Sequence, residues 1–317
     1  MEKNYASTLP DSVLGRAKAA GQKGLEWLAS LDRLLSDLES LWNIQIGKTL
    51  SGGSHACVAE ATGANGQPYI VKLEIPDISE EEYMRGIHAL KIADGQGYCR
   101  LYAFDSTRRA CLLERLGSPL RLLNYPPQKQ MAYLCDALRK TWTMDPGNVS
   151  LPDAQISIDW FRSFLPKAWE ELGRPCHKEI ITRGLSFLDL CQARVGQDSH
   201  YLLHGDAHNN NLLQSLANSE DFSFIDPEGL IGEKAYDLGV IMREWPDELD
   251  TSPATAAVQR AEYLSRLTGV PQDAIWQWGY LQTVSTSLIL LQIGQEELAH
   301  QMLRIALLWV DSPGTDD

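Results

Sequence analysis

Three polar side chains between Tyr201 and Asp226 have the types and spacing that phosphoryl transfer requires. An apolar run leads into His204-Gly205-Asp206, Asn211 follows five residues after Asp206, and a second apolar run ends at Asp226. The pattern predicts strand, loop, strand and loop, with a carboxylate on each loop and a carboxamide between them. Phosphoryl transfer from ATP uses one Asp to receive or orient the acceptor hydroxyl, and an Asn and a second Asp to hold Mg²⁺. We therefore expect Asp206 to be catalytic, and Asn211 and Asp226 to be the metal ligands.

Two features upstream could bind the nucleotide. Ser51, Gly52, Gly53 and Ser54 form a small turn between two apolar runs, and Lys72 lies on a predicted strand. In a kinase, backbone amides of such a hairpin lie near the phosphates of ATP and the strand lysine pairs with them. A plain hairpin turn and a solvated lysine are the ordinary explanations of each feature alone. Their order ahead of the His204 loop favours the nucleotide-binding interpretation.

A helix is predicted after the lysine strand, from Ser79 to Ala93. Ser79 and Glu82 have the spacing of a capping box. A kinase also needs a helix glutamate to hold its lysine, and we assign that role to Glu82, with Glu81 and then Glu80 as alternatives. These acids could instead merely favour the helix N-terminus.

Strand-like residues then reach Glu114 and Leu116, where we expect the hinge that reads adenine through backbone groups. The segment 1–43 contains an amphipathic helix that should pack on a nucleotide-binding lobe at 44–116. Most of 117–317 has helical periodicity and should form a lobe for catalysis and acceptor binding. The expected fold class is α+β, with a small antiparallel β lobe carrying one helix and a larger, mainly helical lobe.

These motifs resemble those of the aminoglycoside phosphotransferases, which share the protein-kinase architecture. The run LHGDAH at 203–208, the run IDPEGL at 225–230, and the amino-terminal segment resemble the streptomycin 6-kinase and hydroxyurea phosphotransferase branch over about 22–250. Gly86 and Glu228 depart from it, since relatives often carry Glu and a basic residue there.

The resemblance implies supporting roles for three further residues. His204 could be a general base, but the kinase template favours a structural donor that holds the loop. His208 is interpreted as loop support, because no His/Cys cluster surrounds it. Asp237 resembles the aspartate that braces the catalytic loop from the following helix.

The acceptor is expected to be a cationic small molecule. The net charge is −14, and the segment 220–250 holds ten acidic residues and two basic ones. Such a charge opposes nonspecific nucleic-acid binding and attracts cations. A solvated surface is the plain alternative, but Glu228, Glu233 and Glu244 are the candidate acceptor ligands.

The first twelve residues lack the basic start and apolar core expected of a signal peptide, and the most apolar late stretch, 286–294, is too short to span a bilayer. Six scattered cysteines suit a reducing compartment, so we expect a cytoplasmic protein without membrane or nucleic-acid partners, as a monomer or weak dimer.

The leading hypothesis is an ATP- and Mg²⁺-dependent O-phosphotransferase that modifies an aminoglycoside such as streptomycin and so confers antibiotic resistance. The alternatives are a kinase of a sugar, amino sugar, choline-like alcohol or hydroxyurea, or a catalytically weak nucleotide-binding protein of the same fold. Fold and catalytic loop do not encode the acceptor.

Overall fold

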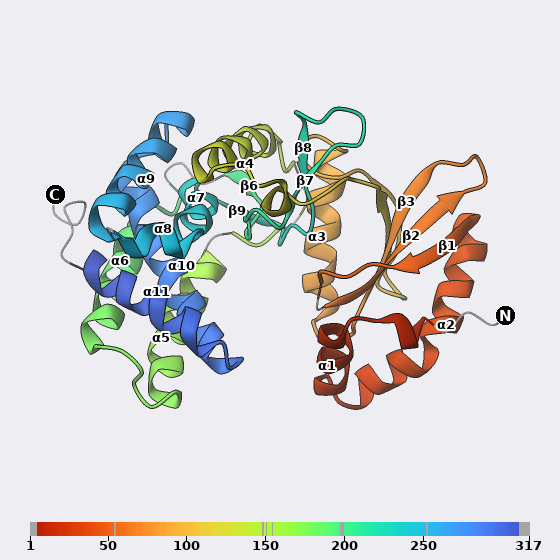
Figure 1. The fold of residues 1–317 in the computed structure, drawn as a ribbon, viewed down its shortest axis with the longest axis horizontal. Helices are drawn as coiled ribbons and strands as arrows, with labels where there is room; N and C mark the ends of the chain where they lie inside the picture. Colours follow the sequence, from red (N-terminus) through yellow and green to blue (C-terminus); the bar gives the residue numbers. More distant parts are fainter. Residues whose placement is uncertain are drawn as a thin grey trace. The chain divides into compact units, whose positions relative to one another are not determined.

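The computed structural model describes residues 5–53, 55–147, 149, 151–153, 155–196, 200–251 and 253–310. Its contacts divide the chain into two compact units (Figure 1). The first unit comprises Met1–Gly117 and Gln214–Ser223, and the second comprises Ser118–Leu213 and Phe224–Asp317. The first boundary lies one residue beyond the predicted end of the small lobe. The segment 214–223, which we had placed in the large lobe, belongs with the first unit.

The first unit contains one antiparallel sheet with the strand order β1-β2-β3-β5-β4. Its elements are the 3₁₀ turn η1 (Ala6–Thr8), α1 (Asp11–Ala19), α2 (Gln22–Trp42), β1 (Ile44–Thr49), β2 (Ala56–Gly63), β3 (Pro68–Glu74), α3 (Glu80–Ala93), β4 (Leu101–Asp105) and β5 (Ala110–Glu114). The β3 and β5 strands pair with Lys72 opposite Cys111, which fixes the lysine strand inside the sheet.

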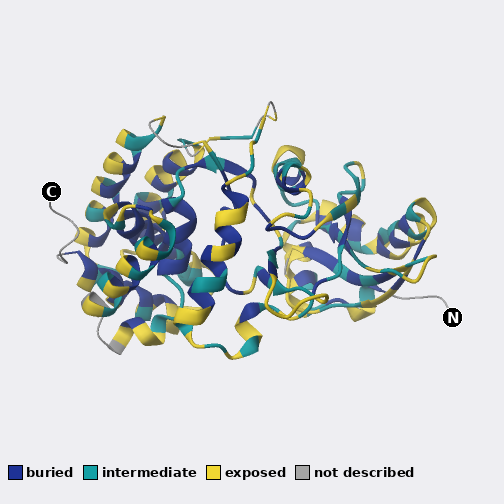
Figure 2. Cartoon of the chain, turned by 90° about the horizontal axis from the view of Figure 1, so that it is seen from above, coloured by how far each residue is buried: buried dark blue, intermediate teal, exposed yellow. Residues whose placement is uncertain are grey.

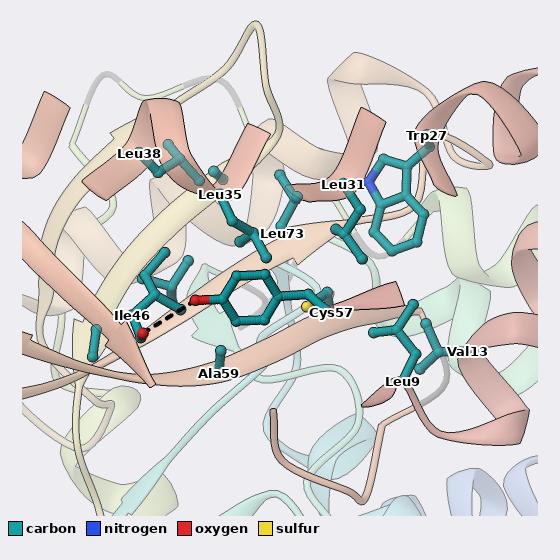
Figure 3. Packing of buried hydrophobic residues seen from close by; sticks show 14 of the residues in the cluster. Leu9, Val13, Trp27, Leu31, Leu35, Leu38, Ile46, Cys57, Ala59 and Leu73 are labelled. Carbon is teal, nitrogen blue, oxygen red and sulfur yellow. Dashed lines mark hydrogen bonds between the residues drawn. The ribbon is translucent and has the colours of Figure 1, made fainter. Parts of the chain in front are cut away.

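The amphipathic helix predicted near the N-terminus is α2, and it covers one face of this sheet (Figure 3). Leu31, Leu35 and Leu38 recur at three- and four-residue steps and are fully buried. They pack with Val71 and Leu73 of β3, which alternate with the more exposed residues of that strand. The apolar face of α2 thus explains why the N-terminal segment forms one core with the sheet.

The N-terminal turn joins this core through polar contacts as well. The Tyr5 hydroxyl donates to the Ile46 carbonyl oxygen at 3.1 Å, the bond drawn as a dashed line at Ile46 in Figure 3. The Tyr5 N–H donates to Asp32 at 2.7 Å. Ser12 Oγ donates to the carbonyl oxygen of Gly53 at 3.0 Å. The segment before the sheet therefore reaches the glycine turn.

The second unit is mainly helical. Its helices are η2 (Leu120–Leu123), α4 (Pro127–Thr141), α5 (Gln155–Glu171), α6 (Lys178–Arg194), α7 (Ala235–Met242), α8 (Pro246–Thr251), α9 (Pro253–Thr268), α10 (Gln272–Gln292) and α11 (Glu296–Trp309). The short strands β6 (Tyr201–Leu203) and β9 (Leu230–Gly232) complete it. The chain passes from one unit to the other within β7 (Leu212–Gln214) and within β8 (Phe222–Phe224). Every residue of α7 is buried, and buried residues gather inside each unit (Figure 2).

The predicted fold class is confirmed: an antiparallel sheet with its helix and a larger, mainly helical lobe form a two-lobe α+β fold. No helix among the described residues is long and apolar enough to cross a membrane. All six cysteines are free thiols.

Candidate active site

Two short strand pairs bring the predicted catalytic residues together. The β7 and β8 strands pair, and the Ile225 N–H donates to the Asn211 carbonyl oxygen at 2.9 Å, so Asn211 and Asp226 lie at the same end of this hairpin. The β6 and β9 strands pair with Leu203 opposite Leu230, and the Glu228 N–H donates to the His204 carbonyl oxygen at 2.8 Å. The catalytic loop therefore lies between the β6–β9 strand pair, whose strands are far apart in sequence, and the local β7–β8 hairpin.

The Asp206 carboxylate is held on both oxygens. Arg243 Nη2 donates to Oδ1 at 2.8 Å, and His208 Nε2 lies 3.1 Å from Oδ2. Burial raises the pKa of Asp206, but the hydrogen bond and charge of His208, with the charge of Arg243, outweigh it and hold that pKa well below its usual range. The side chain is still 36% exposed. Asp206 is thus an ionised, oriented carboxylate that a substrate can reach.

His204 is a structural residue of the loop. Its imidazole is buried, Nδ1 accepts from the Asp206 N–H at 3.1 Å, and Nε2 lies 2.9 Å from the Ile225 carbonyl oxygen. Because Nδ1 accepts, Nε2 must carry the proton and donate to Ile225. Burial lowers the pKa of His204 to about 4, so the ring stays neutral. With both nitrogens engaged and no exposure, the ring supports the predicted structural role and is unsuited to general-base catalysis.

Asp237 braces the loop from α7, where the resemblance placed it. Its fully buried carboxylate accepts from the N–H groups of His204 (3.1 Å) and Gly205 (2.9 Å) and from Trp142 Nε1 (3.0 Å). Burial raises the pKa of Asp237 to about 6, although the three donors favour the charged form. Gly205 has φ +89°, a conformation that L side chains rarely adopt. One carboxylate therefore fixes the backbone of the loop, at a position whose conformation favours glycine.

Sequence reasoning missed two further supports of the loop. Arg243, which directly follows α7, also donates through Nη1 to Gln282 (2.8 Å) and Thr286 (2.9 Å) of α10. The buried Asn209 donates to Gln130 of α4 at 2.9 Å. The sequence does place Arg243 six residues after Asp237, at the end of the same predicted helix. That spacing could have indicated a second contact with the catalytic loop, but no sequence pattern links Arg243 to Asp206.

Asn211 and Asp226 offer the oxygen ligands that Mg²⁺ prefers. Asn211 Nδ2 donates to the Asp206 carbonyl oxygen at 3.1 Å, which leaves the amide oxygen Oδ1 as its acceptor. Asp226 is exposed and has φ 55°. The described residues contain no group of three or more His, Cys, Asp or Glu side chains that could hold a metal. Two protein oxygens completed by phosphate oxygens fit the way Mg²⁺ is usually bound in phosphoryl-transfer sites.

The predicted nucleotide residues lie in the first unit. The glycine turn is the β1–β2 connection, closed by the Leu50 N–H donating to Val58 at 2.7 Å, and Gly52 has φ +125°. Ser54 lies outside the described residues. Glu114 ends β5, where its side chain accepts from the Arg100 N–H at 3.1 Å, and Leu116 is buried. These residues occupy the expected elements, while their contacts with nucleotide stay predictions.

Glu82 forms contacts other than the predicted one with Lys72. It forms a capping box with Ser79: Glu82 Oε2 accepts from the Ser79 N–H at 2.8 Å, and Ser79 Oγ accepts from the Glu82 N–H at 3.1 Å. The Ser79 hydrogen bonds lower the pKa of Glu82. Lys72 Nζ instead lies 3.0 Å from Glu74 Oε1. Pairing of Glu82 with Lys72 stays a prediction, whereas its capping role is observed.

The three candidate acceptor ligands have different surroundings. Glu228 is exposed and lies against Gly205. A Cβ added to Gly205 would come within 2.7 Å of the Cβ of Glu228. Burial has the largest effect on the pKa of His208 and lowers it. The hydrogen bond and charge of Asp206 raise this pKa, and the charge of Glu244 raises it by a smaller amount. Glu233 is engaged in an ion pair with Arg194 at 2.9 Å and by Trp278 Nε1. The first two are thus near the catalytic loop, whereas the Glu233 contacts are those of a structural carboxylate.

A model of the aminoglycoside/hydroxyurea antibiotic resistance kinase family matches residues 42–294. The chain belongs to this family. The prediction of a kinase of the aminoglycoside phosphotransferase type is thereby confirmed.

Relatives of known name support the same assignment. A streptomycin 6-kinase from Streptomyces glaucescens is 24% identical over 274 residues, covering 86% of this chain and 87% of its own. A hydroxyurea phosphotransferase from Kitasatospora aureofaciens is 22% identical over 290 residues, covering 90% and 81%. A crystal structure of aminoglycoside phosphotransferase APH(4)-Ia with ADP and hygromycin B shares the fold, with TM-score 0.58, 14% identity and coverage of 88% and 98%.

Proposed function

We propose that this kinase transfers the γ-phosphoryl group of ATP to a hydroxyl of a cationic small molecule, and that the acceptor is an aminoglycoside such as streptomycin. One observation carries the proposal. Asp206 is ionised, held on both oxygens by Arg243 and His208, and still 36% exposed. A carboxylate prepared in this way suits a residue that must orient an incoming hydroxyl.

Asp206 would act mainly by orientation. Its low pKa makes it a weak base, but each carboxylate oxygen has a second lone pair that can accept from an acceptor hydroxyl. Because the transition state of phosphoryl transfer is loose in most analyses, little base strength is needed before the phosphorus–oxygen bond forms. Asp206 would fix the direction of the hydroxyl and receive its proton late.

Other residues would bind the nucleotide. Asn211 and Asp226 would hold Mg²⁺, which when bound neutralises charge on the phosphates. Lys72 would contact the α- and β-phosphates, and the backbone of the glycine turn would lie along them. Glu114 and Leu116 would present backbone groups to adenine. These roles follow the kinase scheme and the order of the motifs.

The acceptor proposal rests on charge and on the relatives. Glu228 lies beside the catalytic loop, Glu244 acts on His208, and the whole chain carries −14. A cationic acceptor gains from steering by such a field and from paired charges. The streptomycin 6-kinases among the relatives are named for an aminoglycoside.

The test is a phosphorylation assay of the purified full chain with ATP and Mg²⁺. Streptomycin, hygromycin B, choline, hydroxyurea and a neutral sugar are offered separately, and each product is examined by mass spectrometry for one added phosphoryl group. We expect addition to streptomycin that stops when EDTA removes divalent metal. If choline or the neutral sugar is modified in preference to both aminoglycosides, the acceptor proposal is wrong while the kinase assignment stands.

Hydroxyurea is a second candidate acceptor, because one relative is a hydroxyurea phosphotransferase and the family includes that activity. Hydroxyurea is neutral, so it would draw nothing from the acidic residues near the loop. The same panel separates the two acceptors, and a salt-independent KM would accompany hydroxyurea.

We also propose that the protein acts in the cytoplasm as a monomer or weak dimer. ATP is supplied there, and six free cysteines suit a reducing compartment. Light scattering over a range of protein concentrations would test the oligomeric state.

A further inference from the structure

The ion pair of Lys72 lies within a single strand. Lys72 and Glu74 are two residues apart on β3, so their side chains leave the same face of the sheet. Lys72 Nζ is 3.0 Å from Glu74 Oε1, and the two side chains are only 17% and 16% exposed. Val71 and Leu73 point to the opposite face, where they are fully buried in the core with α2. The buried residues on either side of Lys72 thus fix the direction of this pair.

Two of the three glutamates in the first turn of α3 form other contacts. Glu82 closes the capping box with Ser79. Glu81 pairs with Arg85 at 2.9 Å, and its side chain is 79% exposed. Both lie in the first turn of the helix, where acids complement the helix dipole.

The helix residue that reaches the sheet near Lys72 is a tyrosine. Tyr83 is buried, and its hydroxyl donates to the Ala110 carbonyl oxygen at 2.9 Å. Ala110 is paired with Leu73, between Lys72 and Glu74 in the sequence of β3. One turn further along α3, position 86 is Gly and has no carboxylate to offer. The helix therefore presents an aromatic ring where a kinase helix would present its glutamate.

We propose that Glu74, rather than a glutamate of α3, is the carboxylate that positions Lys72 for the phosphates of the nucleotide. The inference rests on the proposed nucleotide role of Lys72. A partly buried pair restricts the long lysine side chain to few conformations. Because both partners belong to one strand, Lys72 is placed without any movement of α3. An activation step that swings a helix glutamate towards the lysine is then unnecessary in this kinase.

The test compares three single variants by the KM for ATP, kcat and the Kd for ADP. Glu74→Gln should raise the ATP KM roughly tenfold, equivalent to about 1.4 kcal/mol, by releasing the lysine. Glu74→Asp keeps the charge on a shorter stem and should give an intermediate value. Asp105→Asn is the matched control: it breaks a similarly buried pair, with Arg108 at 2.6 Å, at the far edge of the same sheet. It should lower Tm and leave the ATP KM within about twofold.

Glu82→Gln provides the rival outcome. The proposal predicts a larger effect on ATP KM from Glu74→Gln than from Glu82→Gln, whose main effect should be a lower Tm through the lost cap. A larger effect from Glu82→Gln would overturn the proposal and show that Glu82 of α3 positions Lys72.

A Lys72→Met variant separates this inference from the proposed function. If Lys72→Met leaves ATP and ADP binding unchanged, Lys72 does not bind the nucleotide. That part of the proposed function is then wrong, and so is the positioning role of Glu74. If Lys72→Met weakens binding, Glu74→Gln should add little in the double variant, because the two residues act as one unit. Fully additive losses would show that Glu74 acts independently and would refute the positioning role.

Discussion

Arg243 holds the catalytic carboxylate: its Nη2 donates to Asp206 Oδ1 at 2.8 Å, while Nη1 is tied to α10 through Gln282 and Thr286. The guanidinium thus connects the catalytic loop to the helical core by a rigid fork. It also places a positive charge beside a residue that we propose meets a cationic acceptor. We interpret the positive charge of Arg243 at this place by its role in orienting Asp206.

Replacing Arg243 should affect turnover more than nucleotide binding. Arg243→Gln is expected to lower kcat about 100-fold, the size of loss that misplacement of a reacting group by about 1 Å can cause, with little change in the ATP KM. Arg243→Lys keeps the charge but not the fork and should retain an intermediate kcat. Arg266→Gln, which removes an exposed arginine paired with Glu262, is the control. Steady-state kinetics with an unchanged kcat for Arg243→Gln would refute the role.

Removing the Asp237 carboxylate should destabilise the whole protein. Asp237→Asn keeps one acceptor oxygen, but its amide NH₂ must face either the Gly205 N–H, which binds Oδ1, or the His204 N–H and Trp142 Nε1, which bind Oδ2. We expect a loss of about 2 kcal/mol or more in the free energy of unfolding, because buried donors are left unpaired. Trp142→Phe removes a single donor and should cost less. Urea unfolding of both variants tests this order, and a larger loss for Trp142→Phe would contradict it.

His204 should make stability depend on pH. Its folded pKa is about 4, whereas an unfolded histidine titrates near 6.5, so the unfolded chain takes up the proton first. Stability should therefore decrease as pH falls from 6.5 towards 4, by at most about 3 kcal/mol from this group.

His204→Asn should be less stable at neutral pH and should lose this dependence. Asp237 has the opposite sign, because burial raises its pKa to about 6 and protonation there favours the folded state. Asp237 is present in both proteins, so the difference between their curves isolates His204. The test is to measure the free energy of unfolding of the unaltered protein and of His204→Asn over this pH range. Parallel curves for the two proteins would show that His204 does not contribute.

Glu228 and Glu233 should separate acceptor binding from stability. Glu228→Gln is expected to raise the acceptor KM by roughly 1.4-fold to fivefold at constant kcat, from the ~0.2–1 kcal/mol of an exposed pair. The effect should shrink in high salt, which screens exposed charges. Glu233→Gln should instead lower stability, by about 1–3 kcal/mol, because it weakens the pair with Arg194. A larger KM effect from Glu233→Gln would restore it as an acceptor ligand.

The order of chemical residues along the chain was sufficient to predict the fold and the catalytic loop. Asp206 and Asp226 follow apolar strand residues, Asn211 directly precedes the strand β7, and Ser79 with Glu82 has the spacing of the capping box that forms. These signals depend on residues close together in the chain, so they can be recognised in a single sequence.

Long-range contacts could not be predicted in the same way. Arg243 meets Asp206, and Gln130 meets Asn209, only because helices far apart in the chain pack together. Glu82 was assigned two roles, and the structure displays the local one. Strand alternation places Lys72 and Glu74 on the same face of β3, but alternation alone does not show which carboxylate the lysine contacts.

The central claim is that Asp206 orients the acceptor hydroxyl for transfer from ATP. Its most direct test is the rate of phosphoryl transfer to streptomycin by Asp206→Asn beside the unaltered protein, with the Kd for ADP measured on both. We expect the rate to fall at least about 100-fold, the lower end of what a positioned proton acceptor contributes, with the ADP Kd nearly unchanged. Transfer by Asp206→Asn at close to the original rate would contradict the account.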